Sequence, residues 1–128
     1  MILFLKKYLL SILVIVTILV LCFMDTTEIE APNILNFDKL VHTVMFLGLS
    51  GVIFFDSTGY LRFQASKILI FYGTFLFPVV LGGIIEILQE YLTKSRTGDW
   101  FDFLFNVFGA LIGLGIAFLI NSRLLIRK

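Results

Sequence analysis

The sequence predicts an all-α integral membrane protein, a bundle of four transmembrane helices, and three observations support this class. Hydrophobic residues make up 59% of the 128 residues, whereas a soluble domain contains about 45–50%. Charged residues make up only 15%, against about 25% in a soluble domain. The apolar residues gather in four runs, and a chain this short cannot bury them all inside a globule. A bilayer must therefore cover them.

Net charge bears on the binding partners of the protein, and cysteine content on its disulfides. The formal net charge is +1, which indicates no attraction to nucleic acid or another polyanion. Cys22 is the single cysteine, so an intrachain disulfide is excluded. Within an apolar run, Cys22 is expected to be a small buried hydrophobic residue.

The first predicted helix spans about residues 8–24, directly after Lys6 and Lys7. A basic start followed by an apolar centre is also typical of a signal peptide. However, no small-x-small cleavage site follows, and the chain continues Asp25-Thr26. A first transmembrane helix is therefore favoured over a signal peptide.

Three further apolar runs complete the predicted bundle, at about 40–55, 68–92 and 101–120. Pro78 in the third run cannot donate to the carbonyl of Thr74, so a kink is expected there. The short loop after this run predicts an antiparallel hairpin of the third and fourth helices. The chain shows no internal repeat or domain break, so we expect a single domain, residues 1–128.

Basic residues predict the orientation in the membrane. Seven fall on the side of the two termini: Lys6, Lys7, Arg62, Lys67, Arg123, Arg127 and Lys128. Three fall on the other side: Lys39, Lys94 and Arg96. The positive-inside rule then places both termini in the cytoplasm. Among the acidic residues, only Asp56 falls on the cytoplasmic side, in the second loop. We therefore expect a multi-pass protein of the bacterial cytoplasmic membrane, with its carboxylate-rich side facing outward.

Polar side chains on three predicted helices converge on that outer side. Asp38 and His42 lie four residues apart and share one helical face, as do Glu86 and Glu90. The remaining polar or small positions are Gln89 on the third helix, Arg96 and Asp99 in the following loop, and Asp102, Asn106, Gly109 and Gly113 on the fourth. An ionisable group on an apolar helix tends to mark a site.

Each of these residues also has a simpler structural interpretation. His42 is either a buried histidine bonded to Asp38, or an acid/base group, a proton site or a ligand. Asp38 and Asp99 suit helix caps, whereas Glu86 lies about two turns inside its helix, which favours function. Asn106 suits either a site or an interhelical hydrogen bond.

The loop arginine and the two glycines have their own alternatives. Arg96 is either an internal counter-ion or a group that binds phosphate or carboxylate through its planar fork. The Gly109-x-x-x-Gly113 spacing favours a close helix–helix contact over a ligand site.

One histidine among several carboxylates suits a hard or borderline cation. Yet two-histidine motifs and other metal-binding spacings are missing from the sequence. We therefore expect no bound metal and no cofactor.

Taken in order, the polar motifs resemble one family. They are D-K-x-x-H at 38–42, E-x-x-Q at 86–89, Arg96, D-x-x-D at 99–102 and N-x-x-G-x-x-x-G at 106–113. This pattern resembles the VanZ-like membrane proteins over about residues 38–120. The resemblance implies four spans and a polar site of unknown chemistry, and the family's namesake is associated with resistance to the glycopeptide teicoplanin.

Three functions fit this pattern. The first is an outward-facing site that binds or modifies a lipid-linked component of the cell envelope, such as a cell-wall precursor. Its catalytic groups would be His42, Glu86 and Asp102, and its binding groups Asp38, Gln89, Arg96, Asp99 and Asn106. The second is a non-catalytic accessory module whose buried charges are structural. A proton or ion pathway is disfavoured, because the inner halves of the predicted helices lack ionisable groups. Whether the protein is an enzyme stays open.

Overall fold

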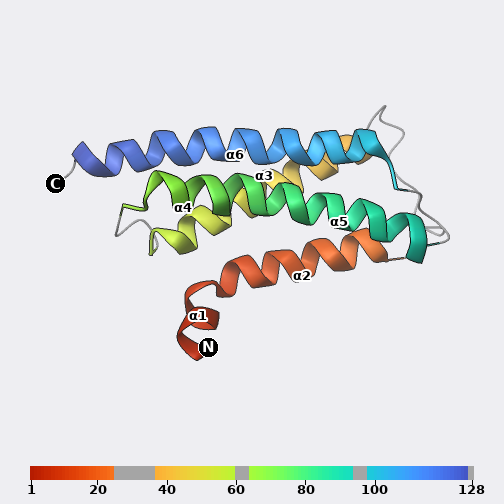
Figure 1. The fold of residues 1–128 in the computed structure, drawn as a ribbon, viewed down its shortest axis with the longest axis horizontal. Coiled ribbons are helices and arrows are strands. Elements are labelled where there is room, and N and C mark those ends of the chain that lie inside the picture. The colour runs from red at the N-terminus through yellow and green to blue at the C-terminus, as the bar shows by residue number, and fades with distance from the viewer. Residues whose placement is uncertain (25–36, 60–63, 94–97, 127–128) are drawn as a thin grey trace.

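The computed structural model describes residues 1–24, 37–59, 64–93 and 98–126. Within these ranges every regular element is a helix, which confirms the all-α prediction (Figure 1). The elements in chain order are α1 (Ile2–Lys7), α2 (Leu9–Phe23), α3 (Phe37–Ser57), α4 (Lys67–Phe71), the π-helical turn η1 (Tyr72–Leu76), α5 (Phe77–Leu92) and α6 (Trp100–Ile126).

Three helical stretches are long and apolar enough to cross a membrane: Phe37–Ser57, Lys67–Leu92 and Trp100–Leu124. The middle one combines α4, η1 and α5. Helix α2 is also apolar but has 15 residues, or about 22 Å at the rise of an α-helix, less than a hydrocarbon core of about 30 Å. The chain is therefore a multi-pass membrane protein. Its four-span count and the cytoplasmic location of its termini stay predictions.

The helices run roughly along one long axis (Figure 1). In that view α6 lies above α4 and α5, α2 lies below them, and the C-terminus and α1 lie toward the left. We call the right-hand end, where α3 and α6 begin and α5 finishes, the polar end. The opposite end holds the connection from α3 to α4.

Helix α3 packs along α6, and small residues permit this contact. A Cβ added at Gly109 would overlap the backbone carbonyl oxygen of Thr43, and one at Gly113 would overlap the side chain of Ser50. Without a side chain at these positions, the two backbones approach closely, as at other small-residue interfaces between membrane helices.

The irregularity expected at Pro78 takes the form of a π-helical turn immediately before it. The N–H of Phe77 donates to the carbonyl of Tyr72, five residues earlier. The hydroxyl of Thr74 donates to the carbonyl of Ile70 at 2.7 Å. Proline lacks an N–H, and a local π-helical adjustment is one way in which a membrane helix satisfies the backbone groups that proline leaves free.

Apolar side chains of α2, α3 and α5 form the main core. It is built from Ile18, Cys22, Phe46, Leu49, Ile53 and Ile85. Cys22 is fully buried in it, in agreement with its interpretation as a small hydrophobic residue. Many large apolar side chains on the outside of the bundle are exposed, as expected where lipid covers them.

Asp56 departs from the sequence prediction. It was expected in an exposed loop, but α3 continues to Ser57 and Asp56 is fully buried. Its Oδ2 accepts hydrogen bonds from the backbone N–H of Ser11 at 3.0 Å and from the Ser11 hydroxyl at 2.7 Å. The expectation that the inner halves of the predicted helices lack ionisable groups is therefore wrong at this residue.

Candidate functional site

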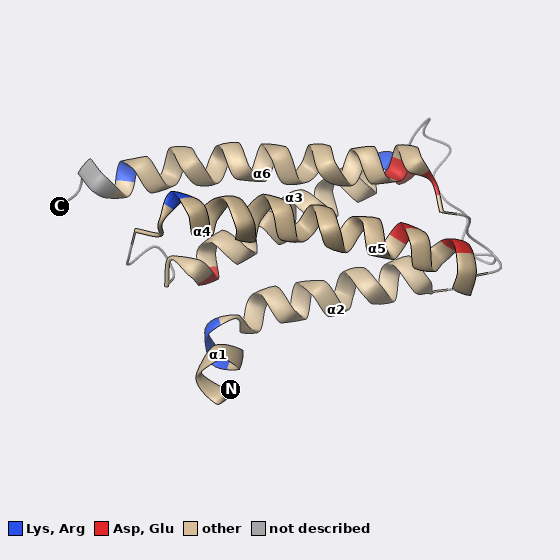
Figure 2. Ribbon diagram, in the orientation of Figure 1, with Lys and Arg blue, Asp and Glu red and all other residues tan. Residues whose placement is uncertain are grey.

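The described acidic residues gather at the polar end of the bundle (Figure 2). Asp38 lies in the first turn of α3 and Asp102 in the first turn of α6. Glu86 and Glu90 lie in the last two turns of α5. Asp56 is the described exception, at the other end. The convergence expected from the sequence is thus present in the structure.

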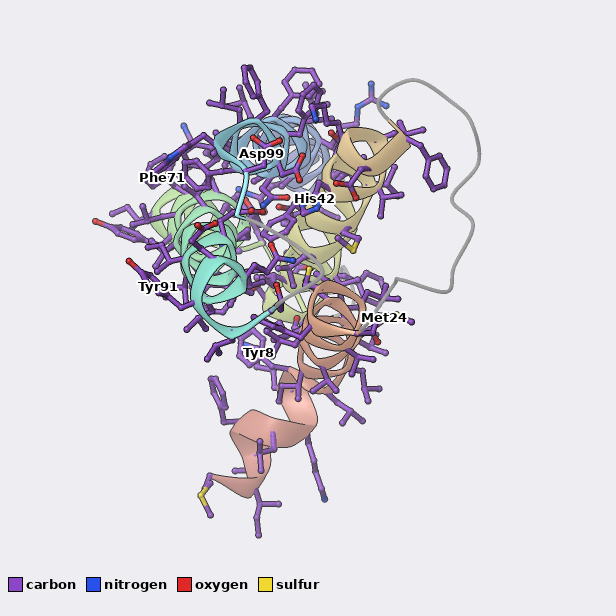
Figure 3. All side chains as sticks on the ribbon, turned by 90° about the vertical axis from the view of Figure 1, so that its right-hand side faces the viewer. Tyr8, Met24, His42, Phe71, Tyr91 and Asp99 are labelled. Atoms are coloured by element: carbon purple, nitrogen blue, oxygen red, sulfur yellow. The ribbon has the colours of Figure 1, made fainter. Side chains whose placement is uncertain are left out.

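His42 lies at the centre of this cluster, among α3, α5 and α6 (Figure 3). It is 2% exposed. Its Nδ1 lies 2.9 Å from Oδ1 of Asn106 and 3.7 Å from Oε1 of Glu86. Its Nε2 lies 3.8 Å from Oδ2 of Asp102 and 4.0 Å from Oδ1 of Asp38. Three carboxylates therefore surround one buried imidazole.

Lys39 is a member of the cluster that the sequence analysis used for orientation and in the D-K-x-x-H motif, but did not name as a site residue. Its Nζ lies 3.5 Å from Oδ1 of Asp102 and 3.8 Å from Oδ2 of Asp99. The available signal was its position three residues before His42, on a neighbouring part of the same helical face. Lys39 supplies positive charge to Asp99, just before α6, and to Asp102 in its first turn.

Glu86 and Glu90 hold the segment that leads into α6. Oε2 of Glu86 accepts from the backbone N–H of Asp99 at 3.1 Å, and Oε2 of Glu90 accepts from that of Gly98 at 2.9 Å. Oε1 of Glu86 also accepts from Nδ2 of Asn106 at 3.4 Å. A Cβ at position 98 would overlap the backbone carbonyl oxygen of Glu86. Glu86 is thus tied into the structure by both carboxylate oxygens.

Two other predicted site residues make structural contacts. Gln89 is buried and donates its side-chain amide to the carbonyl of Cys22, at 2.8 Å, so it ties α5 to α2. Asp99 accepts from the N–H of Phe101 at 2.8 Å, which is the geometry of a cap at the start of α6. Arg96 lies outside the described residues, and both interpretations of it stay open.

A groove opens between α5 and α6 beside the cluster. Its volume is about 550 Å³, and it is lined by Gly83, Glu86, Ile87, Glu90, Tyr91, Gly98, Asp99, Trp100 and Phe103. The acidic residues of this lining are Glu86, Glu90 and Asp99. Tyr91, which points away from the bundle axis in Figure 3, and Trp100 are largely exposed. The groove therefore joins the polar cluster to the exposed apolar surface of the bundle.

The cluster is rich in hydrogen-bond acceptors. Five carboxylates lie at this end, those of Asp38, Glu86, Glu90, Asp99 and Asp102. Among the described residues, Lys39 is the lysine that pairs with them. Ionised carboxylates accept hydrogen bonds from hydroxyl and amino groups and bind cations. The arrangement therefore suits a ligand that carries donors or positive charge.

In a comparison with known protein families, the family model described as VanZ/LLP1 matches residues 3–121. No curated protein and no solved structure matches the chain.

Proposed function

The chain belongs to the VanZ/LLP1 family, and we propose that it binds a lipid-linked component of the cell envelope at its polar end. The lipid tail lies in the groove between α5 and α6, and the head group meets the carboxylates of Glu86, Glu90 and Asp99. The family match confirms the resemblance drawn from the sequence motifs. The match shows which family the chain belongs to but gives no mechanism, so the proposal depends on the geometry of the groove.

The observation that carries the proposal is the amphipathic lining of this groove. Ile87, Tyr91, Trp100 and Phe103 give it an apolar wall, and the acidic side chains lie at one side. Lipid-binding sites need this combination, a mostly apolar cleft with a few placed polar groups.

The depth of the groove also fits a lipid head group. Tyr and Trp are enriched where a membrane meets water, and Tyr91 and Trp100 are 80% and 77% exposed. Glu86 lies five residues before Tyr91, about 7.5 Å further along the helix. A head group just below the aromatic rings would therefore lie between Tyr91 and Glu86, where Glu90 also lines the groove. Carboxylates accept from hydroxyl and amino groups, so a head group bearing a sugar or a peptide fits better than a bare phosphate.

The alternative is a non-catalytic accessory module whose charges are structural. The double anchoring of Glu86 favours this alternative for α5. The groove favours lipid binding, because an internally paired module has no need of a cleft open to the bilayer. An ion pathway finds less support, since on α3 the buried side chains between His42 and Asp56 are apolar except for Ser50.

The test fills the groove without touching the charges. Gly83→Leu places a side chain in the groove, where the nearest described side-chain atom to a new Cβ is Cε2 of Phe103 at 3.4 Å. Gly115→Leu is the matched control, because a Cβ there meets nothing within 4 Å. Both changes replace a helical glycine by the same residue.

Binding is measured by native mass spectrometry and by the melting temperature in detergent. The probes are a polyprenyl-pyrophosphate-linked disaccharide peptide, a polyprenyl phosphate and phosphatidylglycerol. A ligand that binds the folded state raises the melting temperature. We expect the disaccharide peptide lipid to stabilise the native protein and Gly115→Leu, but not Gly83→Leu. Equal binding of all three lipids, or equal binding by both variants, would contradict the proposal.

A link to glycopeptide resistance is a separate part of the proposal. Expression of the native protein and of Gly83→Leu in a susceptible bacterium, with teicoplanin susceptibility as the readout, tests it. Lower susceptibility with the native protein alone is the expected result, and no change with either protein would refute the link.

A further inference from the structure

We propose that Asp38, His42 and Asp102 form a binding site for one divalent metal ion of borderline hardness, Zn²⁺ or Mn²⁺. One ligand atom from each residue lies within 4.8 Å of the others. Imidazole nitrogen suits zinc and other transition metals, and carboxylate oxygen suits manganese and harder ions, so a mixed set favours an ion between these classes. The site lies beside the lipid groove, and its occupation does not require a lipid.

The orientation of His42 provides the first argument. Oδ1 of Asn106 only accepts hydrogen bonds, so the Nδ1 that lies 2.9 Å from it must donate. Nδ2 of Asn106 donates to Oε1 of Glu86, and a flipped amide would set its oxygen against that carboxylate. The neutral ring therefore carries its proton on Nδ1 and presents the lone pair of Nε2.

That lone pair is directed at two carboxylates. Nε2 lies 3.8 Å from Oδ2 of Asp102 and 4.0 Å from Oδ1 of Asp38. Both distances exceed the length of a hydrogen bond, about 2.7–3.2 Å. Three possible ligand atoms thus gather inside a side-chain cluster where His42 is 2% exposed. A cation placed between them would be coordinated by all three.

Asp102 would contribute its Oδ2 to the site from a buried position. The residue is 8% exposed, and its Oδ1 is buried without a hydrogen-bond partner among the described residues. A buried acceptor that lacks a hydrogen bond costs stability. Lys39 offsets part of this cost from 3.5 Å, on the oxygen that does not face His42. Oδ2 remains directed toward Nε2.

The surroundings match those of known metal sites. A metal-bound histidine usually donates its other ring N–H to an oxygen that fixes the orientation of the ring, and Asn106 does this here. The Asp38 side chain is 54% exposed, so an ion can enter from the aqueous side. Three protein ligands leave a position for water or substrate, as in catalytic sites.

Sequence spacing did not reveal this site. His42 and Asp102 lie on different helices, so they form no short motif of the kind that identifies metal sites. The expectation of no metal depended on the missing motif. The proposed site departs from that expectation.

Calorimetric titration of the full chain in detergent, after treatment with a chelator and without added lipid, tests the proposal. The probes are Zn²⁺, Mn²⁺ and Mg²⁺. Asp38→Asn removes a ligand that is half exposed, so the variant is expected to fold. Asp99→Asn is the matched control, because it removes one negative charge from the same end, and asparagine also serves as a helix cap.

We expect saturable binding of one Zn²⁺ or Mn²⁺ per chain, with weaker binding of Mg²⁺. Asp38→Asn is expected to weaken it about tenfold or more, and Asn106→Ala by about 10–100-fold. Asp99→Asn is expected to keep nearly the native affinity. Absence of saturable binding by both ions overturns the proposal. So does an equal loss in the two aspartate variants, since that outcome means general attraction to negative charge. Neither result bears on the groove, which the Gly83→Leu comparison tests separately.

Discussion

Asp56 of α3 caps the beginning of α2 through Ser11, whose backbone N–H and hydroxyl both donate to the same carboxylate oxygen. The first N–H groups of a helix lack partners within it, and a negative charge there is favoured by the helix dipole. Asp56 thus joins α2 to α3 at the end opposite the polar cluster.

Ser11→Ala removes one of these two hydrogen bonds. Because the acceptor is a buried carboxylate, we expect a loss of about 1–3 kcal/mol in the free energy of unfolding. Equilibrium unfolding in mixed detergent micelles measures this change. Ser122→Ala is the control, since that hydroxyl is exposed and donates to Leu119 within its own helix. Equal losses of unfolding free energy in the two variants would show that the hydrogen bond to Asp56 stabilises the protein no more than a surface hydrogen bond does.

Gln89 makes the corresponding link at the other end of α2. In Gln89→Leu the carbonyl of Cys22 loses its side-chain donor, and we expect destabilisation by about 1–3 kcal/mol because this group is buried. Gln64→Leu, at an exposed position, is the control for the added apolar surface. Thermal melting in detergent compares the two variants. If Gln89→Leu melts like the native protein and retains less lipid, Gln89 has the binding role expected from the sequence.

Gly109 sets the distance between α3 and α6. In Gly109→Ala the new methyl group overlaps the carbonyl of Thr43, so the helices must separate, at a cost of about 1–3 kcal/mol. Gly115→Ala places the same methyl group in open space and gains helix propensity of up to about 1 kcal/mol. Unfolding measurements are therefore expected to move in opposite directions for the two variants. A stabilised Gly109→Ala would show that the backbones do not approach this closely.

The carboxylates of Glu86 and Asp102 are expected to differ in their structural roles. Glu86→Gln replaces an oxygen that accepts from Asp99 or Asn106 by an amide that donates, so we expect a lower melting temperature and a loss of about 1–3 kcal/mol. Asp102→Asn removes a charge whose Oδ1 lacks a hydrogen bond among the described residues, so we expect an unchanged or higher melting temperature, as when a functional residue is replaced.

Glu90→Gln serves as the control for Glu86, because Glu90 is exposed and accepts a single described hydrogen bond, from Gly98. A clear loss of stability in Asp102→Asn would favour the structural module over the binding site. Breaking a buried ion pair typically costs about 3–5 kcal/mol.

The sequence predicted the helical class and the convergence of polar side chains from α3, α5 and α6. Both predictions depend on local properties of the chain, the length of each apolar run and the four-residue spacing of polar residues. It placed Asp38 and His42 on one face, and Glu86 beside Glu90, from helical periodicity alone. It also identified the family through the order of its polar motifs.

Contacts between helices could not be predicted in this way. Which oxygen of Asp102 faces His42, and which faces Lys39, depends on the rotation of α6 against α3. Asp56 was assigned to a loop because helix ends are the least certain part of a pattern, and two further residues of α3 brought it inside. The groove depends on the angle between α5 and α6, which no single helix encodes.

The π-helical turn before Pro78 has a consequence for the register of the whole third span. Buried residues recur there at intervals of four: Ile70, Thr74, Pro78, Gly82 and Glu86. In a regular α-helix, a step of four residues rotates a side chain by about 40° beyond a full turn, so this stripe would wind away from the bundle. The wider turn at 72–76 takes back most of that rotation. Wound as a regular α-helix, the same sequence would carry Glu86 about 100° further round the axis, out toward the lipid. Deleting one residue at 72–76 would restore a regular helix and keep Glu86 on the bundle side. The wider turn, about three helical turns before Glu86, thus decides on which side of the helix this carboxylate lies.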